Sequence, residues 1–260
     1  MTPTGMRGRL RLLGLVWPFL AVVLAQAAIA GVSIYTLSAV RAYVGGESLW
    51  SKGQKESIYF LSLYAETADE TYYKRFQAAV AVPLADRDAR LTLDSDTPDH
   101  ERAAEGFTAG GNHPDDIGTM LWLFSSFRSF IYLDRAVVHW TAGDAVIDDL
   151  ILLSERIRGS VQSRQPSRRQ IKLWQSEIYA INERIAPLSQ AFALSLGEGS
   201  RVIANLLLAA NFVTASLLIV LAIWRTRKLL FQRQAFEQAL AAERERAGVT
   251  LAAIGEAVIS

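Results

Sequence analysis

The chain has 260 residues, of which 51% are hydrophobic and 20% charged, and its mean hydropathy is +0.18. That value is high for a soluble domain of this length, which has a large polar exterior, so the apolar excess indicates membrane segments. A formal net charge of +1 gives no global basic field, and nucleic acid is not an expected partner. The sequence contains no cysteine, which excludes disulfide frameworks, thiolate zinc sites and cysteine nucleophiles.

Two uncharged stretches stand out along the chain. Residues 12–40 hold no charged side chain over 29 positions, and residues 202–224 hold none over 23 positions. A helix needs about 20 residues to cross a hydrocarbon core about 30 Å thick. We therefore predict two transmembrane helices, at 12–40 and 202–224, with the lipid bilayer as a partner.

The charges beside these stretches predict an orientation. Basic residues lie before the first stretch and after the second: Arg7, Arg9, Arg11, Arg225, Arg227, Lys228 and Arg233. The intervening residues 41–201 hold 18 basic and 22 acidic side chains, a formal charge of −4. Positive flanks stay on the cytoplasmic side. The N-terminal segment 1–11 and the C-terminus are therefore expected in the cytoplasm, with residues 41–201 across the membrane.

A cleaved signal peptide is the alternative for the first stretch. Ala28-Ile29-Ala30 fits a signal-peptidase site, and the arginines of segment 1–11 would form its charged start. The apolar run before that site is long for a signal peptide, however, and it continues uncharged for ten residues beyond it. We expect an uncleaved signal anchor.

Residues 41–201 show helical periodicity. Apolar residues recur at spacings of three and four in four stripes, at 58–79, 120–137, 147–161 and 171–192. The last stripe follows an a/d pattern over three heptads. Four such helices bury their stripes most simply in a four-helix bundle. The predicted fold class is all-α, with a bundle between two transmembrane helices that are continuous with its first and last helices.

Proline and glycine motifs are expected to divide these helices. Pro83 is expected to end the first one, because proline lacks the backbone donor and clashes with the preceding turn. The motifs Thr-Pro-Asp at 97–99 and His-Pro-Asp-Asp at 113–116 combine a cap, proline at the first helical position and acids near the positive helix end. Breaks are also expected at 143–144 and 165–167.

One arginine pair suggests a ligand site. Arg128 and Arg135 are seven residues apart, which puts them on one face of a helix, and guanidinium groups beside aromatic rings hold carboxylates or phosphates. The candidate ligand-binding residues are Arg128, Arg135, Trp122 and Tyr132. The alternative is that both arginines pair with acids such as Asp134 or Asp148, or extend to the surface.

No catalytic or metal-binding pattern emerges. His100, His113 and His139 lack the spacing that puts two ligands on one helix face, so no metal is expected. There is no Gly-x-Ser-x-Gly elbow, phosphate loop or paired His-Glu motif. We therefore expect no cofactor and no enzyme within these residues. Asn205 and Asn211 in the second span favour hydrogen bonding to a partner helix, and hence a homodimer.

The C-terminal part carries the first family resemblance. Residues 225–247 read as one charged signalling helix, and residues 250–260 are TLAAIGEAVIS. This stretch resembles the opening of PAS domains in bacterial signal proteins, where a helix leads into the first strand. The resemblance implies a strand start at 257–259. Because a strand cannot stand alone, we expect residues 248–260 to be the beginning of a PAS domain that is cut off.

A second resemblance covers the middle of the chain. RAYVGGESLWSK at 41–52 and GGNHPDDI at 110–117 resemble the periplasmic sensor region of proteobacterial membrane proteins that carry PAS, diguanylate cyclase and phosphodiesterase domains. This resemblance implies an inner-membrane receptor that senses an unknown periplasmic ligand and controls cyclic-di-GMP. The alternatives are the sensor part of a histidine kinase and a membrane-anchored docking protein without a signalling role.

Overall fold

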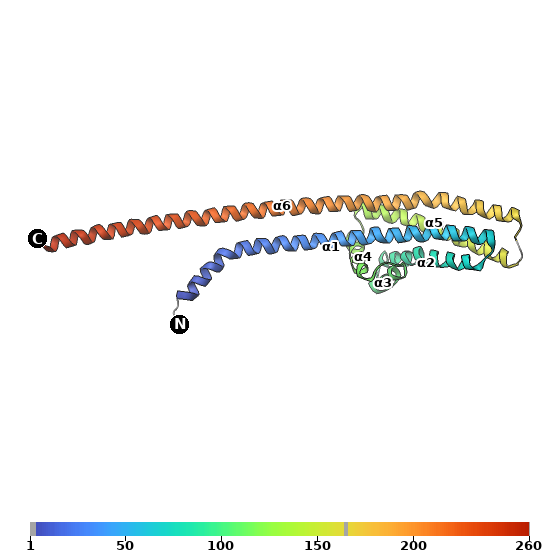
Figure 1. Ribbon diagram of the computed structural model, residues 1–260, viewed down its shortest axis with the longest axis horizontal. Helices are drawn as coiled ribbons and strands as arrows, with labels where there is room; N and C mark the ends of the chain where they lie inside the picture. Colours follow the sequence, from blue (N-terminus) through green and yellow to red (C-terminus); the bar gives the residue numbers. More distant parts are fainter. Residues whose placement is uncertain (1–3, 164–165, 260) are drawn as a thin grey trace. The chain divides into compact units, whose positions relative to one another are not determined.

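The computed structural model describes residues 4–163 and 166–259, and these residues contain helices and no strand. The helices are α1 (Thr4–Thr67), α2 (Glu70–Leu93), α3 (His100–Ala109), α4 (Pro114–Phe127), α5 (Ile131–Ser163) and α6 (Arg168–Ile259), as labelled in Figure 1. The prediction of an all-α fold is confirmed for the part of the chain described.

Contacts between residues divide the chain into two compact units. The first consists of Met1–Gly31 and Leu208–Ser260, and the second of Val32–Leu207. The helices α1 and α6 therefore contribute residues to both units. The second unit also includes residues 32–40 and 202–207, which hydropathy alone had assigned to the spans.

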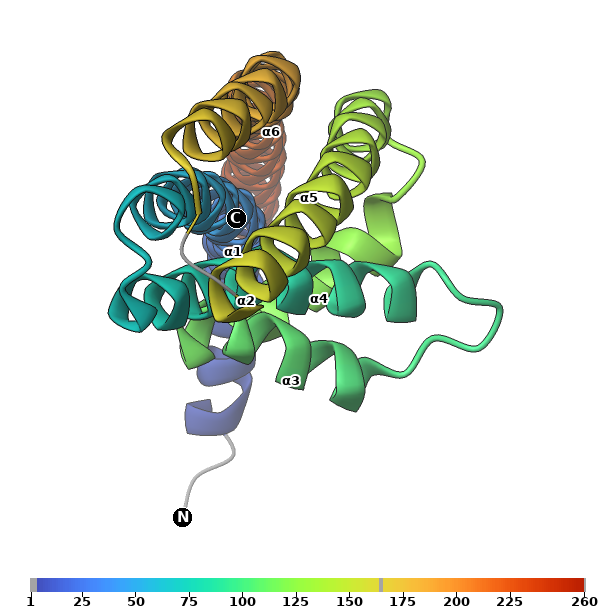
Figure 2. The same cartoon turned by 90° about the vertical axis from the view of Figure 1, so that its right-hand side faces the viewer.

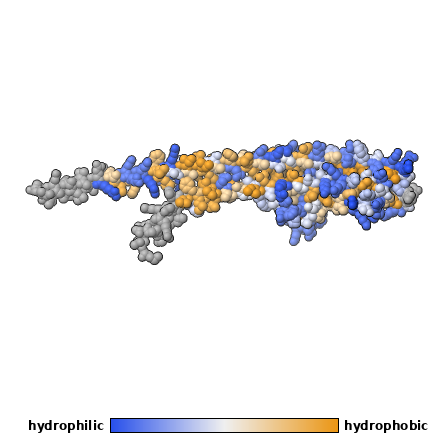
Figure 3. Space-filling model, viewed as in Figure 1, coloured by the Kyte–Doolittle hydropathy of each residue, from blue (hydrophilic) through white to orange (hydrophobic). Residues whose placement is uncertain are grey.

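The first unit contains parts of two helices that are candidates to span a membrane. Its two helices each contain a window long and apolar enough to cross a bilayer, and only 6% of the window in α1 and none of that in α6 is buried. A core helix of a soluble protein would be mostly buried. Figure 3 colours this stretch hydrophobic, and side chains such as Leu208 and Phe212 are 64% and 73% exposed. Such apolar exposure suits lipid and is costly in water.

One polar contact joins the two helices of this unit. The Gln26 amide donates a hydrogen bond of 3.3 Å to Asn211 Oδ1. From the sequence, Asn211 was expected to form a hydrogen bond with a helix of a second copy of the chain. The structure gives it a partner in the same chain, so this residue no longer favours a dimer.

Four long helices line the core of the second unit. Parts of α1 and α6, together with α2 and α5, run alongside one another, as Figures 1 and 2 show, while α3 packs against α2 and α4 packs against α3. Fully buried side chains come from all four long helices, among them Leu61, Phe76, Leu150 and Ile185. The apolar stripes of the sequence face this shared core.

The first predicted helix is in fact two. The stripe at 58–79 was expected to lie on one helix, but α1 ends at Thr67 and α2 begins at Glu70. Ala68 adopts a φ of 57°, and the Asp69 carboxylate accepts a hydrogen bond of 2.8 Å from the Thr71 amide. Asp69 is thus a good N-cap for α2, and the periodicity of apolar residues does not register such a turn.

Pro83 does not end a helix, contrary to the prediction. It lies inside α2, which continues to Leu93. Proline leaves the carbonyl four residues before it without its helical donor, and that residue is Ala79. Gly53 of α1 packs here: a Cβ on Gly53 would lie 2.9 Å from the Ala79 oxygen and 3.1 Å from Pro83 Cδ. A glycine therefore lets α1 approach the proline-containing turn.

The two proline-containing start motifs behave differently. His113 caps α4 through Nδ1, which accepts a hydrogen bond from the Asp115 amide, and Pro114 is the first helical residue, as predicted. In the other motif, Asp99 rather than Thr97 is the cap. Its carboxylate accepts bonds of 3.0 Å from the amides of Glu101 and Arg102, so α3 begins at His100.

The third and fourth stripes are also divided differently from the prediction. The chain turns between α4 and α5 at residues 128–130, whereas α5 runs unbroken through Gly143 and Asp144. Gly143 is instead a contact point, because a Cβ there would lie 2.9 Å from the Trp50 ring. The predicted break at 165–167 agrees with the end of α5 at Ser163 and the start of α6 at Arg168, although residue 165 lies outside the described residues.

The expected strand start at 257–259 is helical, since α6 continues to Ile259. A strand needs a neighbouring strand to satisfy its backbone groups. The described residues offer none, and the local sequence therefore continues the helix.

Candidate functional site: a polar cluster and an aromatic cavity in the core

Four polar side chains lie deep in the core of the second unit. This polar cluster consists of Asp86 and Arg90 of α2, Asn112 just before α4, and Asp144 of α5, and between 3% and 7% of each residue is exposed. Charged residues are seldom buried to this extent unless they are paired. The cluster is therefore the part of the core where polar chemistry is concentrated.

Arg90 and Asp144 form a buried ion pair between α2 and α5. Arg90 Nη2 donates to Asp144 Oδ2 at 2.8 Å, and the guanidinium carbon lies 5.4 Å from the centre of the Trp140 ring. Burial raises the pKa of Asp144 to about 6, although the hydrogen bond and the charge of Arg90 act in the opposite direction. Asp144 is thus largely ionised at neutral pH and becomes neutral in mild acid.

Asp86 lies near this pair but has no ion-pair partner among the described residues. It accepts a hydrogen bond of 3.2 Å from the Asn112 amide, which also donates to the Phe107 carbonyl at 2.9 Å. Burial raises the pKa of Asp86 to about 8; the Asn112 hydrogen bond opposes this shift, and the charge of Asp144 adds to it. Asp86 therefore carries a proton at neutral pH.

Beside Asp86 is a small cavity, the aromatic cavity, whose volume is about 10 Å³. That is room for about one water-sized group. All four long helices contribute to its lining: Tyr43, Gly46, Glu47 and Trp50 from α1, Asp86 from α2, Trp140 from α5 and Phe192 from α6, with Phe107 and Met120 from α3 and α4. The cavity is therefore a meeting point of all six helices.

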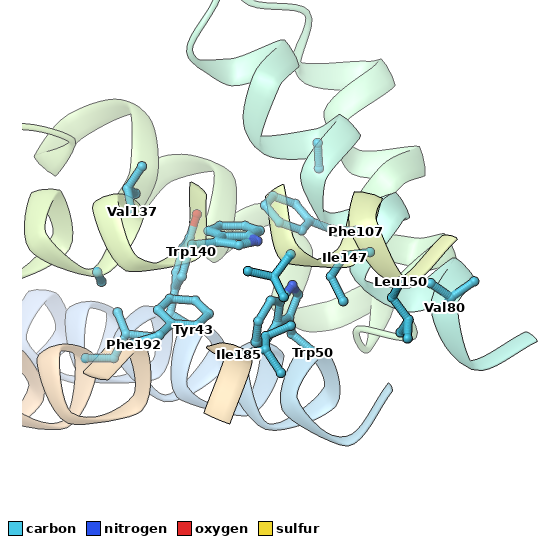
Figure 4. Close-up of a cluster of buried hydrophobic side chains, with 14 of the residues drawn as sticks. Tyr43, Trp50, Val80, Phe107, Val137, Trp140, Ile147, Leu150, Ile185 and Phe192 are labelled. Atoms are coloured by element: carbon cyan, nitrogen blue, oxygen red, sulfur yellow. The ribbon is translucent and has the colours of Figure 1, made fainter. Parts of the chain in front are cut away.

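Three residues that line this cavity each carry a hydrogen-bond donor without a partner in the described part of the chain. The donors are the Tyr43 hydroxyl and the indole nitrogens of Trp50 and Trp140, in residues that are at most 4% exposed. In Figure 4 the nitrogens of Trp50 and Trp140 lie on the sides of their rings that face the centre of the cluster. Buried donors are bonded in more than nine cases out of ten, so three around one cavity mark it as a place for a polar guest.

Two buried residues that do not line the cavity also carry polar atoms without a partner within the described residues. These atoms are Arg90 Nε and both the nitrogen and the oxygen of the Gln54 amide. Phe192 holds the two indoles in place, since it stacks on Trp140 at 5.5 Å and meets Trp50 edge-on at 5.8 Å. Indole nitrogens can only donate, and a protonated Asp86 can donate as well. The cavity therefore suits a hydrogen-bond acceptor the size of one oxygen atom.

The predicted arginine site is not assembled as the sequence suggested. Arg128 ends α4, whereas Arg135 lies in α5, so the two do not share a helix face. Arg128 binds the Asp94 carboxylate at 2.8 Å and that of Asp134 at 2.9 Å, and Arg135 lies 3.7 Å from Glu198. The inference from their spacing is wrong, because the chain turns between them. Whether either arginine binds a ligand stays a prediction.

The two aromatic residues of that predicted site have other neighbours. Trp122 meets Tyr35 edge-on with 5.0 Å between ring centres, and Tyr132 lies 5.5 Å from Phe130. Arg135 lies over the Tyr132 ring at 5.8 Å, so this one pair of the predicted site is in contact.

The polar cluster and the aromatic cavity were missed, although the sequence carried a signal for the cluster. Positions 76, 79, 83, 86, 90 and 93 continue the apolar spacing of three and four along α2, and two of them are Asp86 and Arg90. In α5, Asp144 takes such a position between Trp140 and Ile147. Charged residues in core positions were overlooked because Pro83 and Gly143 were expected to end helices just before them.

No protein-family model, no curated protein and no solved structure matches this chain. Within the described residues, no group of three or more His, Asp or Glu side chains is placed to hold a metal ion. The chemistry that the described site offers is hydrogen bonding and proton exchange at Asp86.

Proposed function

We propose that the chain is the input part of a bacterial transmembrane receptor, with a periplasmic helical sensor between two membrane spans and both termini in the cytoplasm. The observation that carries this proposal is that α1 and α6 both line the aromatic cavity and both contain an uncharged apolar stretch. A change at the cavity would thus act directly on the two helices that enter the bilayer.

Further contacts support coupling between these two helices. Ser51 of α1 and Ser189 of α6 share a hydrogen bond of 2.7 Å, and Ser51 also donates to Glu47, a cavity residue. Farther along, Ser62 and Gln175 are joined by two hydrogen bonds, of 2.7 and 2.8 Å. A stimulus would select between two arrangements of α1 and α6, which is how a receptor without a catalytic site transmits a signal.

The stimulus is taken up, in this proposal, at the aromatic cavity. A guest oxygen would accept hydrogen bonds from Trp50, Trp140 and Tyr43, and proton loss from Asp86 would place an uncompensated charge beside it. Either event alters the packing of helices that share one core, because closely packed cores respond to the size and charge of a single group.

The output is inferred from the family resemblance. It implies a PAS domain after residue 248 and, beyond it, cyclic-di-GMP synthesis or hydrolysis, with the receptor acting as a homodimer. A histidine kinase is the second candidate output, and a docking protein without a signalling role is the candidate outside signalling. The reading frame beyond Ser260 separates these possibilities: Gly-Gly-Asp-Glu-Phe or Glu-Ala-Leu motifs support the first, and a phosphoacceptor histidine with an ATP-binding domain supports the second.

The topology is tested by fusions of alkaline phosphatase and a green fluorescent protein after residues 120 and 240. Phosphatase activity is expected only at 120 and fluorescence only at 240. The same compartment for both positions would refute the proposal.

The role of the cavity is tested in the full-length receptor by Trp140→Phe, which removes the indole donor and keeps an aromatic ring. We expect an altered response to stimulus or pH. Trp174→Phe is the matched control, since Trp174 of α6 is buried to the same extent as Trp140 of α5 but does not line the cavity. Equal responses of both variants and the wild type would remove the cavity from the mechanism.

A further inference from the structure

The turn between α4 and α5 exposes an unusual number of apolar and aromatic side chains. Phe127 is 42% exposed and Ile131 60%, with Phe130 and Tyr132 half-buried beside them. We call residues 127–132 the aromatic corner. Large apolar residues gathered on one turn mark a surface that meets something other than water.

Contacts place this corner at the level where both long helices enter their uncharged stretches. Trp122, near the end of α4, packs on Tyr35, which belongs to the uncharged run 12–40 of α1 and is itself 45% exposed. On α6, a Cβ at Gly199 would lie 2.8 Å from Tyr132 Cβ, three residues before the second uncharged run begins. Trp122 also meets Phe127 of the corner edge-on at 5.4 Å, so the corner is linked to α1 through Trp122 and to α6 through Tyr132.

An apolar hollow lies beside the corner. Its volume is about 30 Å³, and it is lined by Val40, Tyr43, Val44, Leu123, Phe127, Phe130, Tyr132, Leu133, Leu196, Gly199, Ser200 and Ile203. Ile203 already belongs to the second uncharged run. The hollow therefore continues the apolar surface of that run into the folded unit.

Two arginines near the corner are paired within the chain. Arg128 is held by Asp94 and Asp134, and Arg135 faces Glu198. Paired charges that remain partly exposed are tolerated at the headgroup level, where water is present. Aromatic residues are enriched there because their rings are apolar and their edges polar.

The length of the first uncharged run agrees with this placement. Its 29 residues exceed by nine the roughly 20 that cross the hydrocarbon core. The end that carries Tyr35 therefore has room to lie at the lipid–water boundary, together with Trp122.

From these observations we propose that the aromatic corner inserts into the boundary between headgroups and acyl chains of the outer leaflet. This insertion would fix the height and rotation of the helical unit over the bilayer, so that α1 and α6 would move relative to a unit anchored in the lipid. The inference rests on the proposed membrane topology.

The test uses the absence of cysteine in the sequence, which makes single labels unique. Ser129, exposed at the centre of the corner, is changed to Cys and carries a nitroxide in the full chain, reconstituted in phosphatidylcholine–phosphatidylglycerol vesicles. Collisions with oxygen, which enters lipid, and with a nickel chelate, which stays in water, are compared. A ratio severalfold above that of Ser95→Cys, an exposed position after α2, is expected.

Leu208→Cys, in the second uncharged run, is the lipid reference. If Leu208 reports water, the membrane topology itself is wrong. If Leu208 reports lipid while Ser129 matches Ser95, only the corner inference is overturned. A Ser129 label shielded from both reagents would also overturn it, since that outcome indicates a second copy of the chain.

A second variant tests the cause of the insertion. Ile131→Glu, in the protein labelled at position 129, should lower the ratio toward the value for water, because a carboxylate resists entry into the acyl region. Leu152→Glu is the matched control, since Leu152 is also in α5 and is 59% exposed against 60% for Ile131. It should leave the ratio unchanged.

Discussion

Arg90 and Arg128 lie in the same helical unit, and each is bound to aspartates, yet their surroundings differ. The side chain of Arg90 is 5% exposed and that of its partner Asp144 7%, whereas the side chain of Arg128 is 34% exposed and its partners are Asp94 and Asp134. Each arginine also stacks on an aromatic ring, Trp140 or Phe124. Because both arginines have partners, we expect burial to decide how much each ion pair matters to the free energy of unfolding.

The largest effect is expected from breaking the buried pair. Arg90→Met leaves Asp144 in the core without its cation and should lower the free energy of unfolding by about 3–5 kcal/mol. Chemical unfolding of the full chain in detergent measures this loss. Arg90→Met combined with Asp144→Leu should restore most of it, and a double variant as unstable as the single one would contradict the proposed cause.

The next effect concerns Asp86 and pH. Its pKa of about 8 in the folded protein lies above the value of ~3.9 expected in the unfolded chain, so the folded state keeps a proton that the unfolded state releases. The free energy of unfolding should therefore fall as pH rises between these two pKa values, by up to ~1.4 kcal/mol per pH unit. Asp144, with a pKa of about 6, contributes to the pH dependence mainly below pH 7.

Unfolding measured between pH 7 and pH 8 isolates the contribution of Asp86. Asp86→Asn, which resembles the neutral acid, should flatten the slope in that interval and change stability little near pH 6. A slope that survives this substitution would show that another group releases the proton.

A smaller effect is expected from crowding the polar cluster. A Cβ at Gly110 would collide with Asp86 Oδ1, so Gly110→Ala should cost about 1–3 kcal/mol of unfolding free energy. Gly118→Ala in α4 is the matched control, because a Cβ there meets nothing within 4 Å. Alanine favours a helix over glycine, so the control should be neutral or slightly stabilising.

The smallest effect is expected at Arg128. Arg128→Ala should change the free energy of unfolding by at most ~1 kcal/mol, because partly exposed pairs are screened by water and salt. The same unfolding assay at low and high salt checks this. A loss as large as that of Arg90→Met would mean that exposure does not separate the two arginines.

Much of the fold was predictable because it depends on local pattern. Uncharged runs identify the helices able to span a bilayer, and the spacing of apolar residues identifies the core-facing stripes of α5 and α6. Helix ends were less predictable. The start of α4 at His113 followed from its cap and proline, but the positive φ of Ala68 and the continuation of α2 past Pro83 depend on packing against other helices.

The candidate site could not be predicted from local sequence patterns either, because it also depends on how the helices pack. Arg128 and Arg135 drew attention by their spacing, which assumes one unbroken helix, and the turn at 128–130 separates them. The charged residues at core positions of α2 gave a usable signal. Asp144 at a core position of α5 gave a similar signal, but its pairing with Arg90 could not be predicted, because the distance between the two residues in sequence says nothing about their distance in space.

By itself, then, the sequence determined that this chain is helical, that two of its stretches suit lipid better than water, and which faces of its helices avoid solvent. These are properties of composition and period, and they hold whatever the helices pack against. Only the tertiary structure decided that Asp86 lies buried with no ion-pair partner among the described residues, that Trp50 and Trp140 line one cavity, and that Trp122, beside the aromatic corner, packs on Tyr35. Each of these depends on which helix lies beside which, because desolvation and hydrogen bonding are set by neighbours distant in sequence.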